Sequence, residues 1–193
     1  PPRSTLFPYT TLFRSTCWLG GTFKKSAFAQ QLQICEDEKL PAITPIGFAP
    51  KQHKLKDRVI RWAIKSSNRF PWDVLFFEYN HNDKTVMSLS KSSEKMLDSY
   101  LELVRLAPSA KNKQPWRVLK DPLHSSYHFY LQKTKGHPQK GVFNFQRLDI
   151  GIAVCHFDLM RIEQKVKGKW IFGDPKYNVS NEWHYTITFE AEK

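Results

Sequence analysis

Cysteine and long apolar segments are scarce in this 193-residue chain. Its three cysteines, Cys17, Cys35 and Cys155, are widely spaced and form no CxxC or Cys/His metal-binding pattern. This argues against a disulfide scaffold and predicts a reducing, cytoplasmic compartment, with each cysteine a small buried apolar residue. The apolar stretches are short and interrupted by charges, so we expect no membrane-spanning helix. The first residues also lack the basic and apolar regions of a secretory signal.

Several motifs of enzyme chemistry are also missing. The chain has no GxGxxG loop and no P-loop, so no Rossmann site for a tightly held nicotinamide is encoded. It contains no Ser/His/Asp or Cys/His arrangement and no carboxylate pair suited to general acid–base work. We therefore predict no catalytic side chain and no metal site. His156 is expected to be a structural histidine rather than an acid or base.

Positive charge, in contrast, is abundant. Lys and Arg number 30 against 18 Asp and Glu, a formal net charge of +12. Such a balance fits a nucleic-acid partner or a cofactor that carries phosphate. The basic residues are scattered in ones and twos, and no run of five occurs. This distribution disfavours a nucleic-acid module, which we keep only as a third hypothesis.

Hydrophobic residues make up 40% of the chain and aromatic residues 14%, which predicts a folded protein. Apolar periodicity and breaker residues predict helices over 24–31, 55–64, 94–106 and 149–165, the last with Asp149 as N-cap. Short strands are expected over 41–48, 116–119, 127–131 and 183–189, and a polar surface connection over 78–93. Helices and strands are mixed along the chain without a regular βαβ repeat, so the predicted class is α+β.

The first fifteen residues are set apart from this scheme. Residues 5–15 read TLFPYTTLFRS, which resembles letter for letter the translation of a common sequencing adapter. The alternative is a natural extended segment, because Thr, Tyr and Phe favour strands. We interpret residues 1–15 as an adapter-derived artefact and expect the natural N-terminus to be missing.

The most informative segment is residues 107–116, APSAKNKQPW. A predicted helix stops at Pro108, and the short polar residues Ser109, Asn112 and Gln114 follow before Trp116 begins a strand. Their side chains could direct donors and acceptors at a planar polar ligand. A plain helix end followed by a turn explains the same residues equally well.

The APSAxNxQPW pattern resembles the signature of the FMN-dependent nitroreductase family. The resemblance implies that Pro108, Ser109 and Asn112 contact the flavin and that Gln114 supports the loop. It also implies a nitroreductase-like α+β fold with an antiparallel central sheet flanked by helices. The expected cofactor is FMN, with NAD(P)H and a small-molecule acceptor as transient partners.

Three further segments resemble the same family. In TCWLGG, residues 16–21, the backbone of Leu19, Gly20 and Gly21 would approach the flavin ring, although an ordinary turn is the alternative. Beyond PIGF, residues 45–48, basic residues of the family reach the FMN phosphate. Arg58 and Arg61 are the candidates, and a solvated helix face explains them at least as well. Residues 148–157 resemble the central packing helix, in which Gly151 and Ala153 would allow close helix contact.

The order of these segments resembles a tandem subfamily that joins two half-domains in one chain. The expected boundaries are 16–90 for the C-terminal part of a first half-domain and 91–193 for the second. At full length such a chain would be a monomeric pseudo-dimer, with a homodimer as the alternative. An arginine-rich opening that holds the FMN phosphate in the family is absent here, which makes activity of this truncated copy doubtful.

The function implied by the resemblance is hydride transfer from NAD(P)H to nitroaromatic or quinone-like acceptors. The alternative is a protein that stores or senses flavin without turnover.

Overall fold

The computed structural model describes residues 15–16, 18–20, 25–35, 38, 40–44, 46–47, 62, 65, 67–90, 95–134 and 144–192. The chain divides into two compact units, Pro1–Ile60 and Arg61–Lys193. In the first unit, strands β1 (Ser15–Thr16) and β2 (Ile46–Gly47) pair antiparallel, and Leu19 bridges Ile43. Helix α2 spans Lys25–Gln31.

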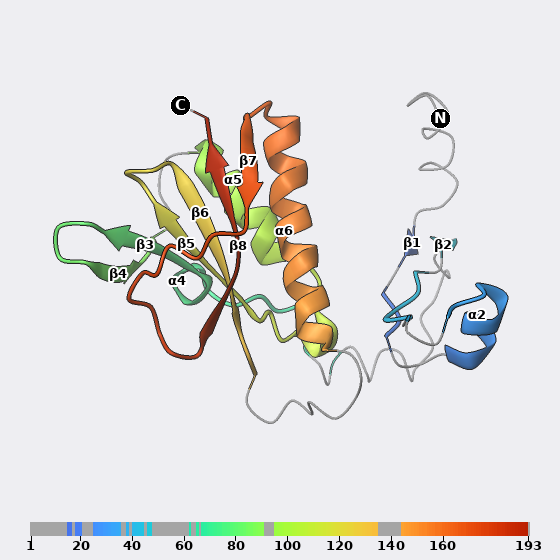
Figure 1. The fold of residues 1–193 in the computed structure, drawn as a ribbon. Coiled ribbons are helices and arrows are strands. Elements are labelled where there is room, and N and C mark those ends of the chain that lie inside the picture. The colour runs from blue at the N-terminus through green and yellow to red at the C-terminus, as the bar shows by residue number, and fades with distance from the viewer. Residues whose placement is uncertain are drawn as a thin grey trace. The chain divides into compact units, whose positions relative to one another are not determined.

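The second unit is built on a six-stranded sheet in the order β4-β3-β5-β6-β8-β7 (Figure 1). Its strands are β3 (Phe76–Asn80), β4 (Thr85–Ser88), β5 (Trp116–Asp121), β6 (Ser126–Gln132), β7 (Gly168–Ile171) and β8 (Trp183–Ala191). All neighbouring strands run antiparallel except β3 and β5, which are parallel. Short turns join β3 to β4 and β5 to β6, as antiparallel neighbours allow.

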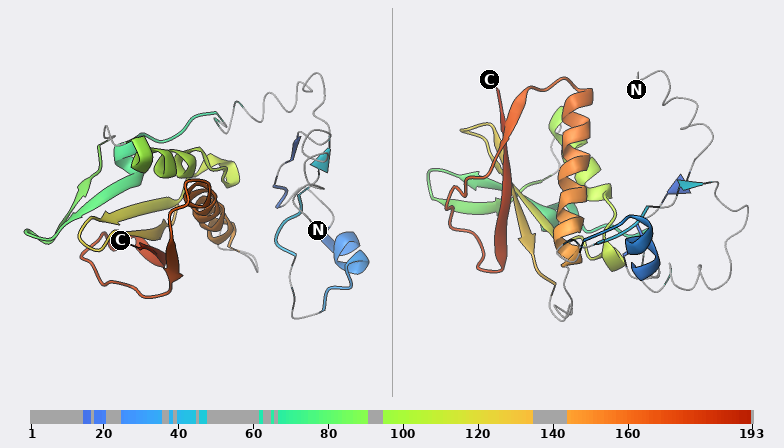
Figure 2. Two further views of the ribbon diagram at one scale, coloured as in Figure 1. Left: turned by 90° about the horizontal axis from the view of Figure 1, so that it is seen from above. Right: turned by 45° about the vertical axis from the view of Figure 1, so that its right-hand side comes forward.

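Helices α5 (Lys95–Leu106) and α6 (Phe145–Glu163) lie side by side on one face of this sheet, as the views of Figure 2 show. The short helix α4 (Trp72–Leu75) leads into β3. The apolar sides of α5 and α6 pack against the sheet and form a buried core. In this core Tyr100, Val104 and Phe157 of the helices lie together with Trp116 and Phe129 of the strands. Burial of a side chain of this size contributes about 1.5–3 kcal/mol, so this layer supplies most of the unit's hydrophobic stabilisation.

A smaller apolar cluster covers the opposite face of the sheet. Tyr79, Leu119 and Tyr130 are buried there. Tyr177, from the segment between β7 and β8, and Trp183, the first residue of β8, pack on them. The rings of Tyr79 and Tyr177 stack at a centroid distance of 4.1 Å. The strands of the sheet centre are therefore buried on both faces, which explains why apolar residues are adjacent in them, as in Val118–Leu119 of β5 and Phe129–Leu131 of β6.

The predicted fold class is confirmed as an α+β arrangement with a largely antiparallel sheet and flanking helices. The predicted helices 24–31, 94–106 and 149–165 correspond to α2, α5 and α6, and Pro108 follows the end of α5. The strands expected at 116–119, 127–131 and 183–189 correspond to β5, β6 and β8. The predicted helix over 55–64 lies outside the described residues, apart from Trp62.

Other expectations need correction. Asp149 is not an N-cap, because α6 begins one turn earlier with Asn144, whose side chain accepts the N–H of Gln146 at 3.0 Å. Gly151 does not serve close packing, since a Cβ placed there would meet nothing within 4 Å. Cys35 and Cys155 are exposed rather than buried.

Part of the expected surface connection 78–93 is sheet. β3 and β4 form a hairpin within the second compact unit, which begins at Arg61. The half-domain boundary expected at residue 90 stays a prediction. The expected strand over 41–48 is reduced to β2 and the single bridge at Ile43. None of the helices within the described ranges is long and apolar enough to cross a membrane.

Candidate functional site

The loop between α5 and β5 carries the motif singled out from the sequence. Helix α5 ends at Leu106, the buried Ala107 follows, and a single 3-10 turn, η2 (Ala110–Asn112), precedes β5. Trp116 is fully buried at the start of β5 and anchors that end of the loop. The loop is therefore held between two buried points while its centre is partly exposed.

Side-chain hydrogen bonds fasten the loop to itself and to α6. The hydroxyl of Ser109 accepts the N–H of Gln114 at 2.9 Å. The carboxylate of Asp149, which lies in α6, accepts the N–H of Ala110 at 2.8 Å. Backbone N–H groups that the irregular turn leaves outside regular structure are satisfied in this way.

A second set of hydrogen bonds joins the loop to the segment that precedes α4. The Asn112 amide donates to the carbonyl oxygens of Lys65 and Asn68 at 2.7 and 2.8 Å, and its oxygen accepts from Arg69 at 3.3 Å. The side-chain oxygen of the buried Gln114 accepts the N–H of Phe70 at 2.8 Å. The two amide side chains of the motif thus bind a distant stretch of backbone.

The backbone of the loop is unusual. Lys111, Asn112 and Gln114 have φ angles of 51°, 54° and 46°, the left-handed region that non-glycine residues avoid. Each such residue costs about 1–3 kcal/mol and persists where surrounding contacts enforce it. Here the hydrogen bonds of Asn112 and Gln114 provide that enforcement, so the loop keeps a defined shape at a strained position.

The loop and the 65–70 segment enclose a pocket of about 540 Å³. Its lining combines four cationic side chains, three amides and one aromatic ring, namely Lys65, Arg69, Lys111, Lys113, Asn68, Asn112, Gln114 and Phe70. A second pocket of about 400 Å³ shares Phe70 and Lys113 with it and extends to Arg117 and Gln132. Volumes of this size suit small molecules and cofactors.

Electrostatics make the pocket attractive to anions. Burial, together with the nearby positive charge of Arg105, lowers the pKa of Arg69, although the guanidinium stays protonated at neutral pH.

Burial also raises the pKa of Asp149 to about 6, while its hydrogen bond from Ala110 acts in the opposite sense. The carboxylate beneath the loop is therefore close to neutral in mildly acidic solution.

The residues predicted for the site fall into three groups. Ser109, Asn112 and Gln114 lie together in the loop, and Pro108 is exposed beside them. Leu19 and Gly20 lie in the first unit, where Leu19 exchanges two backbone hydrogen bonds with Ile43. Gly21, Arg58 and Arg61 lie outside the described residues.

Sequence reasoning missed Lys65, Arg69, Phe70 and Asp149, all of which contact or line the loop. The stretch NRFPW, residues 68–72, offered only a turn signal, since Pro71 sits among polar and aromatic residues. Its role depends on hydrogen bonds to residues about forty positions away. His156 has the structural role expected, because its Nδ1 lies 3.1 Å from the carbonyl oxygen of Leu103 and joins α6 to α5.

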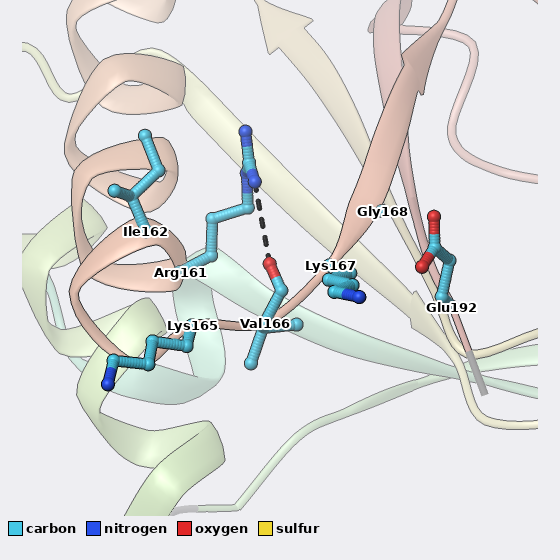
Figure 3. Close-up of a pocket in the computed structure, with 7 residues that line it drawn as sticks. All are labelled: Arg161, Ile162, Lys165, Val166, Lys167, Gly168 and Glu192. Carbon is cyan, nitrogen blue, oxygen red and sulfur yellow. Dashed lines mark hydrogen bonds between the residues drawn. The ribbon is translucent and has the colours of Figure 1, made fainter.

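Figure 3 shows a more open pocket of about 460 Å³ where α6 ends and β7 begins. Arg161 points into it and donates to the carbonyl oxygen of Val166 at 3.4 Å and to Asp158 at 2.6 Å. Its guanidinium is thus committed to protein acceptors. None of the residues predicted for the site lines this pocket, so the 109–114 loop remains the candidate site.

The chain is similar to known proteins in sequence and in fold. A family model described as "Putative TM nitroreductase" matches residues 8–161. Among solved structures, a "putative nitroreductase" from Thermotoga maritima superposes with a TM-score of 0.52 at 18% identity, over 96% of this chain and 58% of that one. At this identity the likeness concerns the fold, and the chain spans only 58% of the length of that relative. The search of curated proteins found no match.

Proposed function

Because the chain belongs to the TM nitroreductase family, we propose that it is part of an FMN-dependent oxidoreductase that moves hydride from NAD(P)H to nitroaromatic or quinone-like acceptors. One observation carries the proposal. The family motif is folded into the wall of a cationic pocket of about 540 Å³ in which amide and aromatic groups also meet.

The pocket lining fits the chemistry of FMN. A phosphate dianion needs positive charge and N–H donors, and Lys65, Arg69, Lys111 and Lys113 supply the charge. A planar ring with polar edges needs apolar surface beside amides, and Phe70, Asn112 and Gln114 offer both. Bound FMN would supply the hydride chemistry itself.

The residues of this chain would then bind FMN and orient its ring. The backbone of the 109–114 loop would hold one edge of the ring, with Ser109 and Asp149 fixing the loop's shape. Asn112 requires an adjustment, because its amide is engaged by Lys65, Asn68 and Arg69. We propose that Asn112 holds the loop through these hydrogen bonds and gives up one of them when its amide contacts the flavin ring. Leu19, Gly20, Gly21, Arg58 and Arg61 are proposed as further flavin-binding residues on the family resemblance alone.

The cellular location and the oligomeric state are proposed from the same family resemblance. A cytoplasmic location suits an enzyme that uses NAD(P)H, and a chain of full length would form the site as a pseudo-dimer or a homodimer. A flavin-binding protein without turnover is the competing function. The loop supports it equally, since the same contacts are needed for binding and for catalysis.

The test is to purify the chain with FMN and measure its absorbance, then NAD(P)H oxidation with nitrofurazone or menadione. Flavin retention with acceptor-dependent oxidation supports the enzyme, and stable flavin without oxidation supports the binding protein. A Lys111→Ala, Lys113→Ala double variant should retain much less flavin. As a control, Lys167→Ala and Lys169→Ala, at the other end of the unit, should leave retention unchanged. A protein that binds no flavin and is retained on DNA in a salt-sensitive way would contradict both readings.

A further inference from the structure

A second cluster of chemically active side chains lies at the far end of β5. β3 and β5 are parallel neighbours with Glu78 opposite Lys120, so the residues that follow both strands emerge at the same edge of the sheet. His81 directly follows β3, Asp121 ends β5, and His124 lies in the turn to β6. The 109–114 loop of the candidate site joins β5 at the other end of the strand, at Trp116. The six-residue strand therefore separates the two places by roughly 17–20 Å.

The two imidazoles converge on one carboxylate. His81 Nε2 lies 2.8 Å from Asp121 Oδ1, and His124 Nδ1 lies 2.7 Å from Asp121 Oδ2. One ligand atom from each of the three residues lies within 4.8 Å of the other two. This is a two-histidine, one-carboxylate set, assembled from turns forty residues apart.

The carboxylate is rigid, whereas the imidazoles are accessible. Asp121 is fully buried and accepts the N–H groups of Leu123 and His124 at 2.9 and 3.2 Å, and the Tyr177 hydroxyl also donates to it. The side chains of His81 and His124 are 31% and 61% exposed. An ion could thus approach from solvent and find one oxygen donor already fixed in place.

We propose that His81, Asp121 and His124 bind a divalent transition-metal ion such as Zn²⁺. Neutral imidazole and carboxylate suit Zn²⁺, Ni²⁺ and Cu²⁺, whereas Mg²⁺ and Ca²⁺ prefer sites made of oxygen. Zn²⁺ bonds of about 2.0–2.2 Å place tetrahedral ligand atoms roughly 3.4 Å apart. The two imidazole nitrogens, up to 4.8 Å apart, must therefore approach each other by up to about 1.4 Å, and the carboxylate oxygens must separate slightly from the imidazoles.

Ion binding also rearranges protons at the two rings. The N–H hydrogens that point at Asp121 are His81 Nε2–H and His124 Nδ1–H, and the ion takes their places. Each ring then carries its proton on the opposite nitrogen, the tautomer that a metal-bound imidazole requires. The ion would connect the β3–β4 turn to the β5–β6 turn and stabilise the second unit by mass action.

The experiment uses the full chain after treatment with EDTA and dialysis. Titration with Zn²⁺, followed by calorimetry and thermal unfolding, should give one equivalent bound and a rise in Tm that EDTA reverses. His124→Ala is the main variant, since an exposed side chain can be removed without unfolding the protein, and it should weaken Zn²⁺ binding at least tenfold. His81→Ala should do the same. His184→Ala, an exposed histidine of β8, should bind Zn²⁺ as the unaltered chain does.

Substitution with Co²⁺ identifies the ligands. Visible bands of tetrahedral Co²⁺ without thiolate charge-transfer bands are expected, because the site contains nitrogen and oxygen donors. Thiolate bands would assign the ion to an exposed cysteine and overturn the proposal. Equal Zn²⁺ affinity in His124→Ala and the unaltered chain, or no Zn²⁺ binding by a folded chain, would show that the cluster is a hydrogen-bonded turn only. The result should be the same with and without FMN.

Discussion

The carboxylate of Asp149 accepts the backbone N–H of Ala110 at 2.8 Å, which fixes the second turn of α6 to the first residue of the loop's 3-10 turn. Its other oxygen, Oδ2, is buried without a hydrogen-bond partner among the described residues. A carboxylate in this situation is costly to ionise. The shape of the candidate flavin loop therefore depends on a group whose charge is disfavoured.

Asp149 should make stability depend on pH in an identifiable way. Burial raises its pKa from 3.8 to about 6, so between roughly pH 4 and 6 the folded state binds more protons than the unfolded state. Its contribution to the free energy of unfolding therefore falls as pH rises through this window and stays low above it. Asp149→Asn, which keeps an oxygen for Ala110, should remove this loss and stabilise the chain at pH 7 by up to about 3 kcal/mol.

Urea unfolding at a series of pH values, compared between the two proteins, measures the effect. Other carboxylates act on both proteins alike, so the difference between the curves isolates Asp149. Asp73→Asn, an exposed position in α4, is the matched control and should leave the curve unchanged. Parallel curves for Asp149→Asn and the unaltered chain would contradict the assignment.

Asn112→Ala should weaken both the fold and flavin binding. Its amide joins the loop to Lys65, Asn68 and Arg69, so truncation should lower the free energy of unfolding by about 1–3 kcal/mol. FMN affinity should fall as well, because the pocket wall loses its connection. Fluorescence titration with FMN and chemical denaturation give the two quantities. Asn68→Ala is the control, since only its backbone takes part in these bonds, and a stability loss equal to that of Asn112→Ala would contradict this prediction.

The positive φ of Lys111 predicts opposite effects on stability and binding. The left-handed conformation costs a non-glycine residue about 1–2 kcal/mol, so Lys111→Gly should be neutral or stabilising by up to about 1 kcal/mol. It should also reduce FMN affinity by removing a cationic side chain from the pocket. At Lys113, which has an ordinary φ of −77°, the same change should destabilise by about 0.5–1 kcal/mol. Denaturation curves for the two variants decide the matter, and equal destabilisation would exclude strain at Lys111.

Local signals in the sequence predicted the helices α2, α5 and α6 and the strands β5, β6 and β8. Pro108 follows the end of α5, and Tyr100, Leu101 and Val104, which recur at helical spacing, are buried on one side of it. The motif loop was also found, because its short polar residues follow a helix end. These features depend on neighbours close in sequence, which is why periodicity and breaker residues reveal them.

The missed features depend on partners far away in the chain. β4 is an edge strand whose side chains are mostly exposed, so its polar sequence looks like a surface connection. The contacts of Arg69 and Phe70 with the loop arise only after the sheet has formed. Asp is a residue type favoured at helix N-caps, but Asn144 caps α6 one turn before Asp149. Asp149 therefore lies inside the helix and accepts the N–H of Ala110 in the loop. Long-range pairing decides the contacts of Arg69, Phe70 and Asp149 with the loop, whereas the start of α6 is set locally by Asn144.

The last prediction concerns β7, which, like β3 and β4, was not predicted from the sequence. Gly168 begins β7 opposite Ala191, and a Cβ at this position would overlap the backbone oxygen of Glu190 and the ring of Phe189. Backbone cannot yield as a flexible side chain does, so Gly168→Ala should destabilise the chain by about 1–3 kcal/mol. Gly151, in the exposed part of α6, is the matched control, because a Cβ there has free space and alanine favours helix. Gly151→Ala should therefore stabilise by about 0.5–1 kcal/mol. Thermal unfolding should show a lower Tm for Gly168→Ala and a higher Tm for Gly151→Ala. An unchanged or raised Tm for Gly168→Ala would mean that β7 does not pack against β8 as described.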